Sequence, residues 1–261
     1  MRAVRKIAFC ANAGNPGAEA VRRRLAATAA ELRMEVVDAA PDAVVALGGD
    51  GTMLAAVHRH PGVPVLGLNL GSLGFLAGVE EPQFEDALRA LAEGRCEILE
   101  RAALEVRGAR ALNEVVVSRG SGGHAATLDL EVDGRPATRF TADGLVIATP
   151  TGSTAYSLAA GGPILLPETQ SFVLTPICPH ALASRPLVVR DTARFTVRAR
   201  VRPGAPPLAV FADGVRVAEL RDGESVDVAK APEPVPMVVF AGVNPYRVLE
   251  RKLGWRGSSV R

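Results

Sequence analysis

The first 95 residues alternate between short apolar runs and longer stretches in which apolar residues recur every three or four positions. The apolar runs, which are typical of strands, lie at 6–11, 35–38, 43–47 and 63–70. The helical spacing follows the Asn15-Pro16 pair and returns between Phe84 and Leu91. Strands that are apolar throughout belong to sheets that are covered on both faces. The pattern therefore predicts an α/β domain with a parallel sheet over residues 1–95.

The pattern changes near residue 96, where many short strands separated by turn residues begin. Asp-Gly pairs at 133–134, 213–214 and 222–223 indicate hairpin turns, because these residue types tolerate positive φ. One helix is expected at about 153–160. We therefore predict a mainly antiparallel β domain over residues 96–244. The last segment, 245–261, has helical spacing, and we expect it to pack back on the first domain.

Composition narrows the class of protein. Thirty basic residues against 28 acidic ones give the 261-residue chain a net charge of +2, so we expect no nucleic-acid partner. No apolar run reaches the roughly 18 residues of a membrane span, so we expect no membrane association. Three distant cysteines and four histidines match neither a disulfide framework nor a zinc-ligand spacing. We predict a reduced, cytoplasmic protein without metal-ligating residues.

The strongest local signal is the segment Gly48-Gly49-Asp50-Gly51-Thr52, which joins the apolar run 43–47 to a helix predicted at about 53–59. Such strand–helix junctions bind phosphate in α/β proteins, and glycines let a phosphate approach the backbone. A carboxylate at this place, Asp50, suits either a metal ion or the proton of a nucleophile. The alternative is an ordinary turn with Asp50 as N-cap. A second glycine loop, 68–75, is either structural or an extension of the same pocket.

Two further polar segments lie in the predicted β domain. Asn113-Glu114 interrupts an apolar strand, and a bulge there could bring both side chains to one ligand. An amide plus a carboxylate suits a ribose diol, and the alternative is a solvated strand end. Residues 149–157 carry six hydroxyl side chains, which are suitable partners for a nucleotide base or sugar. The Asp143-Gly144 pair before them could by itself be another hairpin turn.

Together these segments resemble the ATP-dependent or polyphosphate-dependent NAD kinases. The matching segments are 48–52 (GGDGT), 69–76 (NLGSLGFL), Asn113-Glu114, 143–163 (DGLVIATPTGSTAYSLAAGGP) and 174–180 (LTPICPH). Lipid kinases share GGDGT, whereas the TPTGSTAY stretch after an Asp-Gly pair is specific to NAD kinases. The resemblance covers roughly residues 7–250. It implies the two domains predicted above and a homodimer or homotetramer. It also implies an NAD site between the domains that a neighbouring subunit completes.

The resemblance also implies roles for single residues. Asp50 would be the general base, and with Gly51 it would contact NAD. Asn113 and Glu114 would hold the adenosine ribose. The other NAD contacts that the resemblance implies are His124, Asp143, Thr154, Ala155, Tyr156, Ser157, Leu158 and Ala159.

The implied reaction transfers the terminal phosphoryl group of ATP or polyphosphate to the 2′-hydroxyl of the adenosine ribose of NAD, which gives NADP. Asp50 would accept the hydroxyl proton, and a divalent metal ion, Mg²⁺, would be bound with the phosphoryl donor. Two other classes stay open. A lipid kinase would share Asp50 without needing the hydroxyl-rich segment, and a non-catalytic dinucleotide sensor would tolerate the loss of Asp50.

Overall fold

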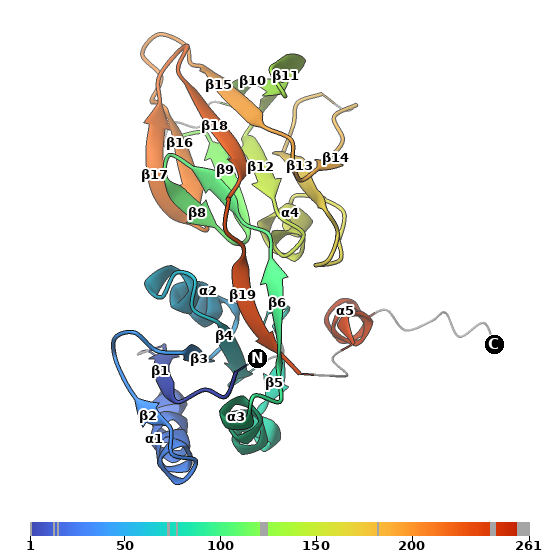
Figure 1. Ribbon diagram of the computed structural model, residues 1–261. Helices are drawn as coiled ribbons and strands as arrows, with labels where there is room; N and C mark the ends of the chain where they lie inside the picture. The colour runs from blue at the N-terminus through green and yellow to red at the C-terminus, as the bar shows by residue number, and fades with distance from the viewer. Residues whose placement is uncertain are drawn as a thin grey trace, which may run out of the picture. The chain divides into compact units, whose positions relative to one another are not determined.

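The chain consists of two compact units. The computed structural model describes residues 2–12, 14, 16–71, 74–76, 78–120, 125–181, 183–240 and 244–254. Unit 1 contains Met1–Glu100 and Val235–Arg261, and unit 2 contains Arg101–Pro234. Unit 1 is therefore built from both ends of the chain, and unit 2 is the continuous stretch between them (Figure 1).

The described part of unit 1 holds one seven-stranded sheet. Its strands are β1 (Lys6–Ala11), β2 (Glu35–Val36), β3 (Ala43–Leu47), β4 (Val65–Asn69), β5 (Val79–Glu80), β6 (Glu97–Arg101) and β19 (Val235–Val239). Their order is β2-β1-β3-β4-β19-β6, with β5 also paired to β4. β1 runs parallel to β2 and β3, and β4 runs parallel to β3, β5 and β19. The predicted α/β fold with a parallel sheet is confirmed.

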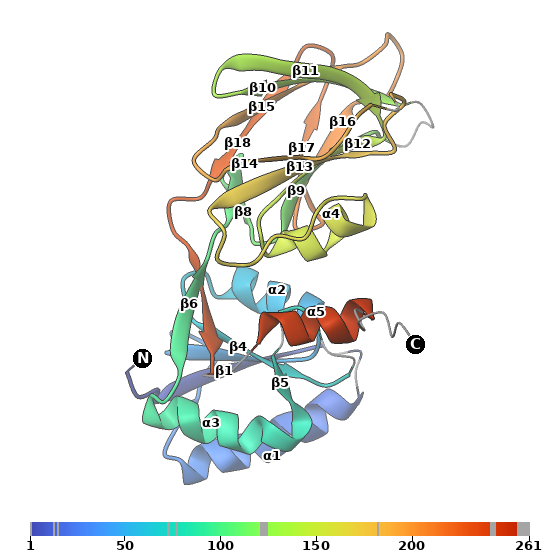
Figure 2. The same cartoon turned by 90° about the vertical axis from the view of Figure 1, so that its right-hand side faces the viewer.

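Helices cover both faces of this sheet (Figure 2). They are α1 (Pro16–Glu31), α2 (Asp50–Arg59), α3 (Phe84–Glu93), which follows the 3-10 turn η1 (Glu81–Gln83), and α5 (Pro245–Leu253). On one face, Leu25 of α1 and Leu88 of α3 join the sheet residues in one core. On the other face, α2 buries Met53 and Ala56. β3 and β4 are consequently buried along their whole length.

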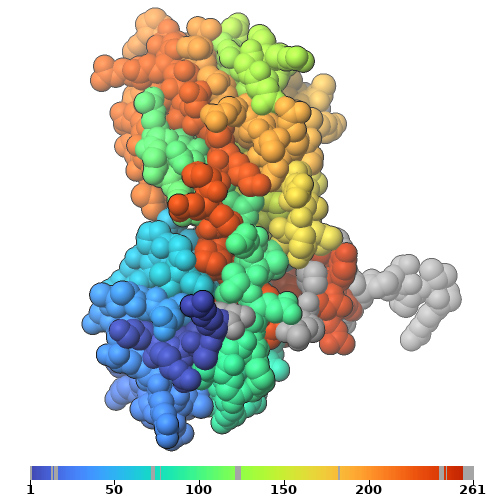
Figure 3. Space-filling view, in the orientation of Figure 1, coloured from blue at the N-terminus to red at the C-terminus, as the bar shows by residue number. Residues whose placement is uncertain are grey.

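The units divide at residues 100 and 234, whereas the sequence placed the boundaries at 95 and 244. The difference arises because β6 and β19 are neighbours in the sheet of unit 1, where their green and red atoms lie side by side in Figure 3. The helix that follows β19, α5, contacts the same unit. Arg251 forms an ion pair with Glu80 at 2.6 Å, and Lys252 Nζ lies 5.4 Å from the ring centre of Phe75.

The described part of unit 2 holds two six-stranded antiparallel sheets. One contains β7 (Leu104–Val106), β8 (Ala109–Ala111), β10 (Ala126–Val132), β11 (Arg135–Ala142), β15 (Phe195–Arg200) and β18 (Ser225–Lys230). The other contains β9 (Glu114–Ser118), β12 (Gly144–Ala148), β13 (Ser171–Ile177), β14 (Leu187–Arg190), β16 (Leu208–Ala212) and β17 (Val215–Leu220). The sheet orders are β11-β10-β15-β18-β7-β8 and β14-β13-β12-β9-β16-β17. The predicted antiparallel β domain is confirmed.

The two sheets of unit 2 face each other across the main core (Figure 2). Along β12, Leu145 and Ile147 belong to this core. The alternate residues Val146 and Ala148 belong to a second cluster on the outer face. The short helix α4 (Tyr156–Ala159) lies below that outer face, and Ala160 packs on the second cluster. β12 is thus buried on both faces, and it ends where the hydroxyl-rich segment begins.

Two details of the predicted β domain are wrong. Asp133-Gly134 and Asp213-Gly214 do form hairpin turns. The φ angles are 52° and 72° in the first pair and 46° and 80° in the second. Asp222-Gly223 instead links β17 to β18, which lie in different sheets. The expected helix at 153–160 is two short pieces, the 3-10 turn η2 (Gly152–Thr154) and α4, because Ala155 between them has φ −99° and ψ −125°.

Candidate functional site

The first candidate group lies in unit 1, where β3 turns into α2. The N-cap of α2 is Gly49, which has extended backbone, and Asp50 is the first residue of the helix. The alternative interpretation of Asp50 as the N-cap is therefore wrong. A Cβ atom at Gly49 or Gly51 would meet nothing within 4 Å, so open space flanks Asp50 on the chain. The start of α2 is thus accessible to a ligand.

The Asp50 carboxylate is held by the second glycine loop. Its Oδ2 accepts the N–H of Phe75 and its Oδ1 accepts the N–H of Leu76, each at 3.0 Å. A Cβ atom at Gly74 would lie 2.0 Å from Oδ1, so only glycine allows this approach. The N–H groups of Phe75 and Leu76, at the end of this loop, thus orient the Asp50 carboxylate. Each carboxylate oxygen keeps a lone pair for a ligand.

The second candidate group lies in unit 2, between β8 and β9. Asn113 and Glu114 are 8% and 9% exposed. The backbone N–H groups of Leu112, Asn113 and Glu114 donate to the Asp213 carboxylate at 2.7, 2.8 and 3.1 Å. Asn113 therefore lies at a bend that precedes the strand, and not at the bulge within a strand that the sequence suggested. The alternative of a solvated strand end does not hold, because both side chains are buried.

The end of β12 holds this bend from another side. Thr149 donates its N–H to the carbonyl of Asn113 at 2.9 Å and its hydroxyl to the carbonyl of Leu112 at 2.6 Å. Its hydroxyl also accepts the N–H of Gly152 at 3.0 Å. A Cβ atom at Gly152 would lie 2.0 Å from the Asn113 carbonyl oxygen, so the two segments are in direct backbone contact.

The hydroxyl side chains at 149–157 mostly bond within the protein. Ser153 donates to the carbonyl of Pro150 at 2.6 Å, and Thr154 donates to that of Thr151 at 3.1 Å. Ser157 is fully buried and shares a hydrogen bond with Thr175 at 2.8 Å. These hydroxyls therefore shape the loop, which differs from the expectation that they face a base or a sugar. Tyr156 is 45% exposed, which leaves its ring available to a ligand.

Glu114 is a buried carboxyl with an unusual charge state. Its Oε2 has no hydrogen-bond partner among the described residues. Burial raises the pKa of Glu114 from 4.5 to about 7, the negative charge of Asp213 adds to the rise, and the backbone N–H of Tyr156 opposes it. Near neutral pH this carboxyl therefore exists in both forms. It can donate a hydrogen bond when protonated and accept two or more when ionised.

Asp143 is not brought close to this group. It immediately precedes β12, whose far end, Ala148, pairs with Glu114. The five residue steps between positions 143 and 148 span about 17 Å of strand. Its side chain forms an ion pair with Arg119 at 3.1 Å, and both groups are about one-third exposed. His124 lies outside the described residues. Thr154, Ala155, Leu158 and Ala159 lie in or beside η2 and α4, next to Tyr156.

Sequence reasoning missed Asp213 as a residue of this group. Its Asp-Gly pair correctly indicated a hairpin turn, but no local signal connects it to a segment about 100 residues away. The described residues contain no cluster of three or more His, Cys, Asp or Glu side chains that could hold a metal ion. None of the helices described here is long and apolar enough to cross a membrane.

Comparisons with known proteins identify the class. Residues 27–96 match the ATP-NAD kinase N-terminal domain, and residues 112–240 match the ATP-NAD kinase C-terminal domain. An NAD kinase from Gemmatimonas aurantiaca is 42% identical over 84% of this chain and 80% of its own length. An NAD kinase from Geotalea daltonii is 40% identical over 82% of this chain and 78% of its own length.

Two solved structures share the whole fold. Yeast NADH kinase, crystallised with NADH, has a TM-score of 0.87 at 25% identity and covers 100% of this chain and 90% of its own. An NAD kinase from Archaeoglobus fulgidus, in complex with ATP, has a TM-score of 0.81 at 27% identity and covers 97% of this chain and 100% of its own. Fold and site thus define a nucleotide phosphotransferase. The chain belongs to the NAD kinase family.

The contact between Gly74 and Asp50 yields a first prediction. Gly74→Ala places a Cβ atom 2.0 Å from Asp50 Oδ1, so the carboxylate must move. Asp50 is the candidate general base, and small misplacements of reacting groups can cost up to about a hundredfold, so we expect kcat to fall by about tenfold or more. Steady-state kinetics would measure this. Gly71→Ala is the matched control in the same loop, because its Cβ meets nothing within 4 Å. Equal kcat values for the two variants would contradict the prediction.

The pKa of Glu114 yields a second prediction. Because the folded pKa of about 7 exceeds the ordinary 4.5, the unfolded chain loses this proton first. The free energy of unfolding of the wild type therefore falls as pH rises through this window. Glu114→Gln keeps the shape without the titration. We expect the free energy of unfolding of Glu114→Gln, minus that of the wild type, to rise by about 3 kcal/mol from pH 4.5 to pH 8. This follows from about 1.4 kcal/mol for each unit by which the pKa is raised.

Urea unfolding at both pH values would test this. Glu105→Gln, on the exposed face of β7, is the matched control for replacing a glutamate by a glutamine. A constant difference between Glu114→Gln and the wild type across this range would contradict the pKa assignment.

Proposed function

We propose that this chain transfers the terminal phosphoryl group of ATP to the 2′-hydroxyl of the adenosine ribose of NAD, giving NADP. The observation that carries the proposal is the position of Asp50. Its carboxylate begins α2 and is fixed by two N–H groups at 3.0 Å, yet it stays partly exposed between two open glycine positions. A carboxylate so placed suits a general base for a hydroxyl at a phosphate-binding turn.

Asp50 accepts the proton of the attacking hydroxyl in this proposal. Its two N–H bonds hold the carboxylate in one orientation, so little reorganisation is needed when the hydroxyl arrives. The partial positive charge at the start of α2 favours phosphate at the same place. Gly51 supports the same role, because it leaves room for the ribose to approach the backbone.

The acceptor contacts proposed in unit 2 are Asn113, Glu114 and the segment 154–159. The buried, unpartnered Oε2 of Glu114 supports this, because a buried polar atom without a partner is expected to meet a ligand. Asn113 adds an amide beside it. The exposed ring of Tyr156 suits stacking on a base or on nicotinamide. Ser157 is the weakest of the proposed contacts, since Thr175 already takes its hydroxyl.

Mg²⁺ is proposed as the metal ion that accompanies the phosphoryl donor. Magnesium in phosphoryl-transfer sites is held by one or two carboxylates, by substrate phosphates and by water. The donor phosphates and water would hold most of the ion here, which agrees with the lack of a metal-binding cluster among the described residues. When bound, the ion neutralises negative charge on the transferring group.

The choice of donor and acceptor is also part of the proposal. ATP is favoured over polyphosphate as the donor because the similar Archaeoglobus fulgidus enzyme was crystallised with ATP. NADH is a second acceptor to test, because the similar yeast enzyme is an NADH kinase. We also propose that the protein acts in the cytoplasm, which the reduced cysteines Cys10, Cys96 and Cys178 support.

We further propose a homodimer or homotetramer with shared NAD sites. The support is the family resemblance, which implies an NAD site that a neighbouring subunit completes. Asp143 is the candidate for the contact from the second copy, because it lies about 17 Å of strand away from the Glu114 end of β12.

Asp50→Asn is expected to keep the fold and NAD binding but to lower kcat by about 10²–10⁴, the usual contribution of a general base. The amide oxygen still accepts one of the two loop N–H groups, whereas the NH2 group faces the other and cannot take the proton. NADP formation with ATP as donor would measure the loss. Asp86→Asn, at an exposed carboxylate of the same unit, is the control. An unchanged kcat for Asp50→Asn would sink the assignment.

The shared site can be tested by complementation. Asp50→Asn and Asp143→Ala should each be nearly inactive alone, whereas mixed oligomers contain some sites in which both aspartates are native. We therefore expect activity to return after the two variants are unfolded and refolded together. Variants refolded separately and then mixed give the baseline. No gain over that baseline would show that Asp143 does not act across subunits.

A further inference from the structure

Asp213 forms four hydrogen bonds with the segment that carries Asn113 and Glu114. Its Oδ2 accepts the N–H of Leu112 at 2.7 Å. Its Oδ1 accepts the N–H groups of Asn113 and Glu114 at 2.8 and 3.1 Å. In return, the N–H of Asp213 donates to the carbonyl of Glu114 at 3.0 Å. One carboxylate therefore fixes three consecutive peptide groups beside the proposed nucleotide contacts.

We propose that Asp213 is a positioning residue for the nucleotide, which acts by holding Asn113 and Glu114 in the orientation that binds NAD. This inference rests on the proposed function, because it assumes that these two residues contact the nucleotide. Asp213 does not itself touch the ligand in this account. Its carboxylate is occupied by the backbone, and its effect passes through the peptide groups of residues 112–114.

The geometry explains why an aspartate is needed at this place. A short side chain on a residue with φ of 46° brings both carboxylate oxygens under the bend, and glycine follows it at φ 80°. Three donors converge on two oxygens, which a carboxylate can satisfy and an amide cannot. The buried N–H groups would otherwise lack acceptors, which costs free energy and loosens the bend.

Electrostatics adds a second effect. Asp213 is the charged group that, after burial, contributes most to the raised pKa of Glu114. Glu114 therefore keeps a proton to higher pH while Asp213 is ionised. A protonated Glu114 can donate its O–H to a ligand acceptor. Asp213 thus affects both the position and the hydrogen-bonding character of its neighbour.

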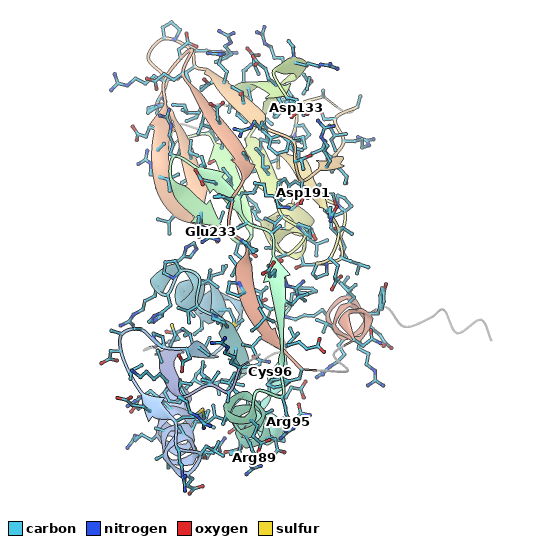
Figure 4. The ribbon with its side chains drawn as sticks, viewed as in Figure 1. Arg89, Arg95, Cys96, Asp133, Asp191 and Glu233 are labelled. Carbon is cyan, nitrogen blue, oxygen red and sulfur yellow. The ribbon has the colours of Figure 1, made fainter. Side chains whose placement is uncertain are left out.

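The competing explanation is that Asp213 merely caps a hairpin turn. Asp133 provides the comparison within the same unit, at the hairpin of β10 and β11 (Figure 4). It also precedes a glycine, has φ of 52° and accepts a backbone N–H, from Arg194 at 3.0 Å. It is bonded to neither Asn113 nor Glu114. A role limited to turn stability would make the two aspartates equivalent.

The test compares Asp213→Asn with Asp133→Asn in the full-length protein. Calorimetric titration would measure NAD affinity, and steady-state kinetics with Mg²⁺ and ATP would measure KM and kcat. We expect Asp213→Asn to weaken NAD binding and raise KM for NAD by about tenfold or more, because a displaced Glu114 loses its charged hydrogen bond to NAD. The KM for ATP should stay within about threefold. Asp133→Asn should leave every kinetic constant unchanged.

Each outcome is decisive. Equal NAD affinities for the two variants would overturn the inference, as would a fall in kcat without a change in KM or affinity. If Asp213→Asn does not fold, Asp213→Ser takes its place, because a hydroxyl still accepts one N–H. Failure of both to fold while Asp133→Asn folds would assign Asp213 to stability alone. If the wild type binds NAD without forming NADP, the proposed function fails, and the titrations still test Asp213. Absence of NAD binding by the wild type would overturn both.

Discussion

Buried peptide N–H groups at the junction of β8 and β9 must find acceptors, and the arrangement of unit 2 around this junction follows from that constraint. Asp213 supplies acceptors from the β16–β17 hairpin. Thr149, at the end of β12, bonds the carbonyls of the same segment from another side. Because β9 pairs with both β12 and β16, the two anchors sit on strands that already flank it. The bend is therefore tied to the sheet on both sides.

Aspartates anchor the backbone at several other places in this chain. Asp42 accepts the N–H groups of Arg5 and Lys6 at 2.9 and 2.8 Å, and Asp222 accepts that of Val201 at 2.9 Å. Asp50 makes the same kind of bond with Phe75 and Leu76. Its hydrogen bonds alone therefore do not mark it as catalytic. What distinguishes Asp50 is its place at a helix start with open glycines on both sides.

The fold was predictable where the signal is local. Runs of buried apolar residues with polar ends placed β1 and β3 to the residue. The boundaries of the units were not predictable in this way, because β6 and β19 become neighbours only through pairing between distant parts of the chain. Asp222-Gly223 shows the same limit. Its sequence equals that of the two true hairpins, but the strands on either side of it pair with other partners.

In the candidate site, too, local signals were readable from the sequence and long-range contacts were not. The motif around Asp50 stood out because a glycine-rich turn with a carboxylate follows an apolar strand. Asn113 and Glu114 stood out because they interrupt an apolar strand. The hydrogen bonds of Ser153 and Ser157 within the protein were not predictable, since composition does not tell whether a hydroxyl faces a ligand or another protein group. Asp213 was missed because its effect depends on spatial proximity to residues about 100 positions earlier.

The sheet of unit 1 also has a consequence for the synthesis of the chain. β19 lies between β4 and β6, so β6 and the Val65 end of β4 keep an unpaired edge until residues 235–239 leave the ribosome. At roughly 5–20 residues per second, the stretch between β6 and β19 takes about 7–30 seconds to translate. Open strand edges invite pairing with other chains during that time. Unit 2 is continuous in sequence and can fold first, so the nascent protein faces its greatest risk of aggregation while its amino-terminal half waits for its last strand.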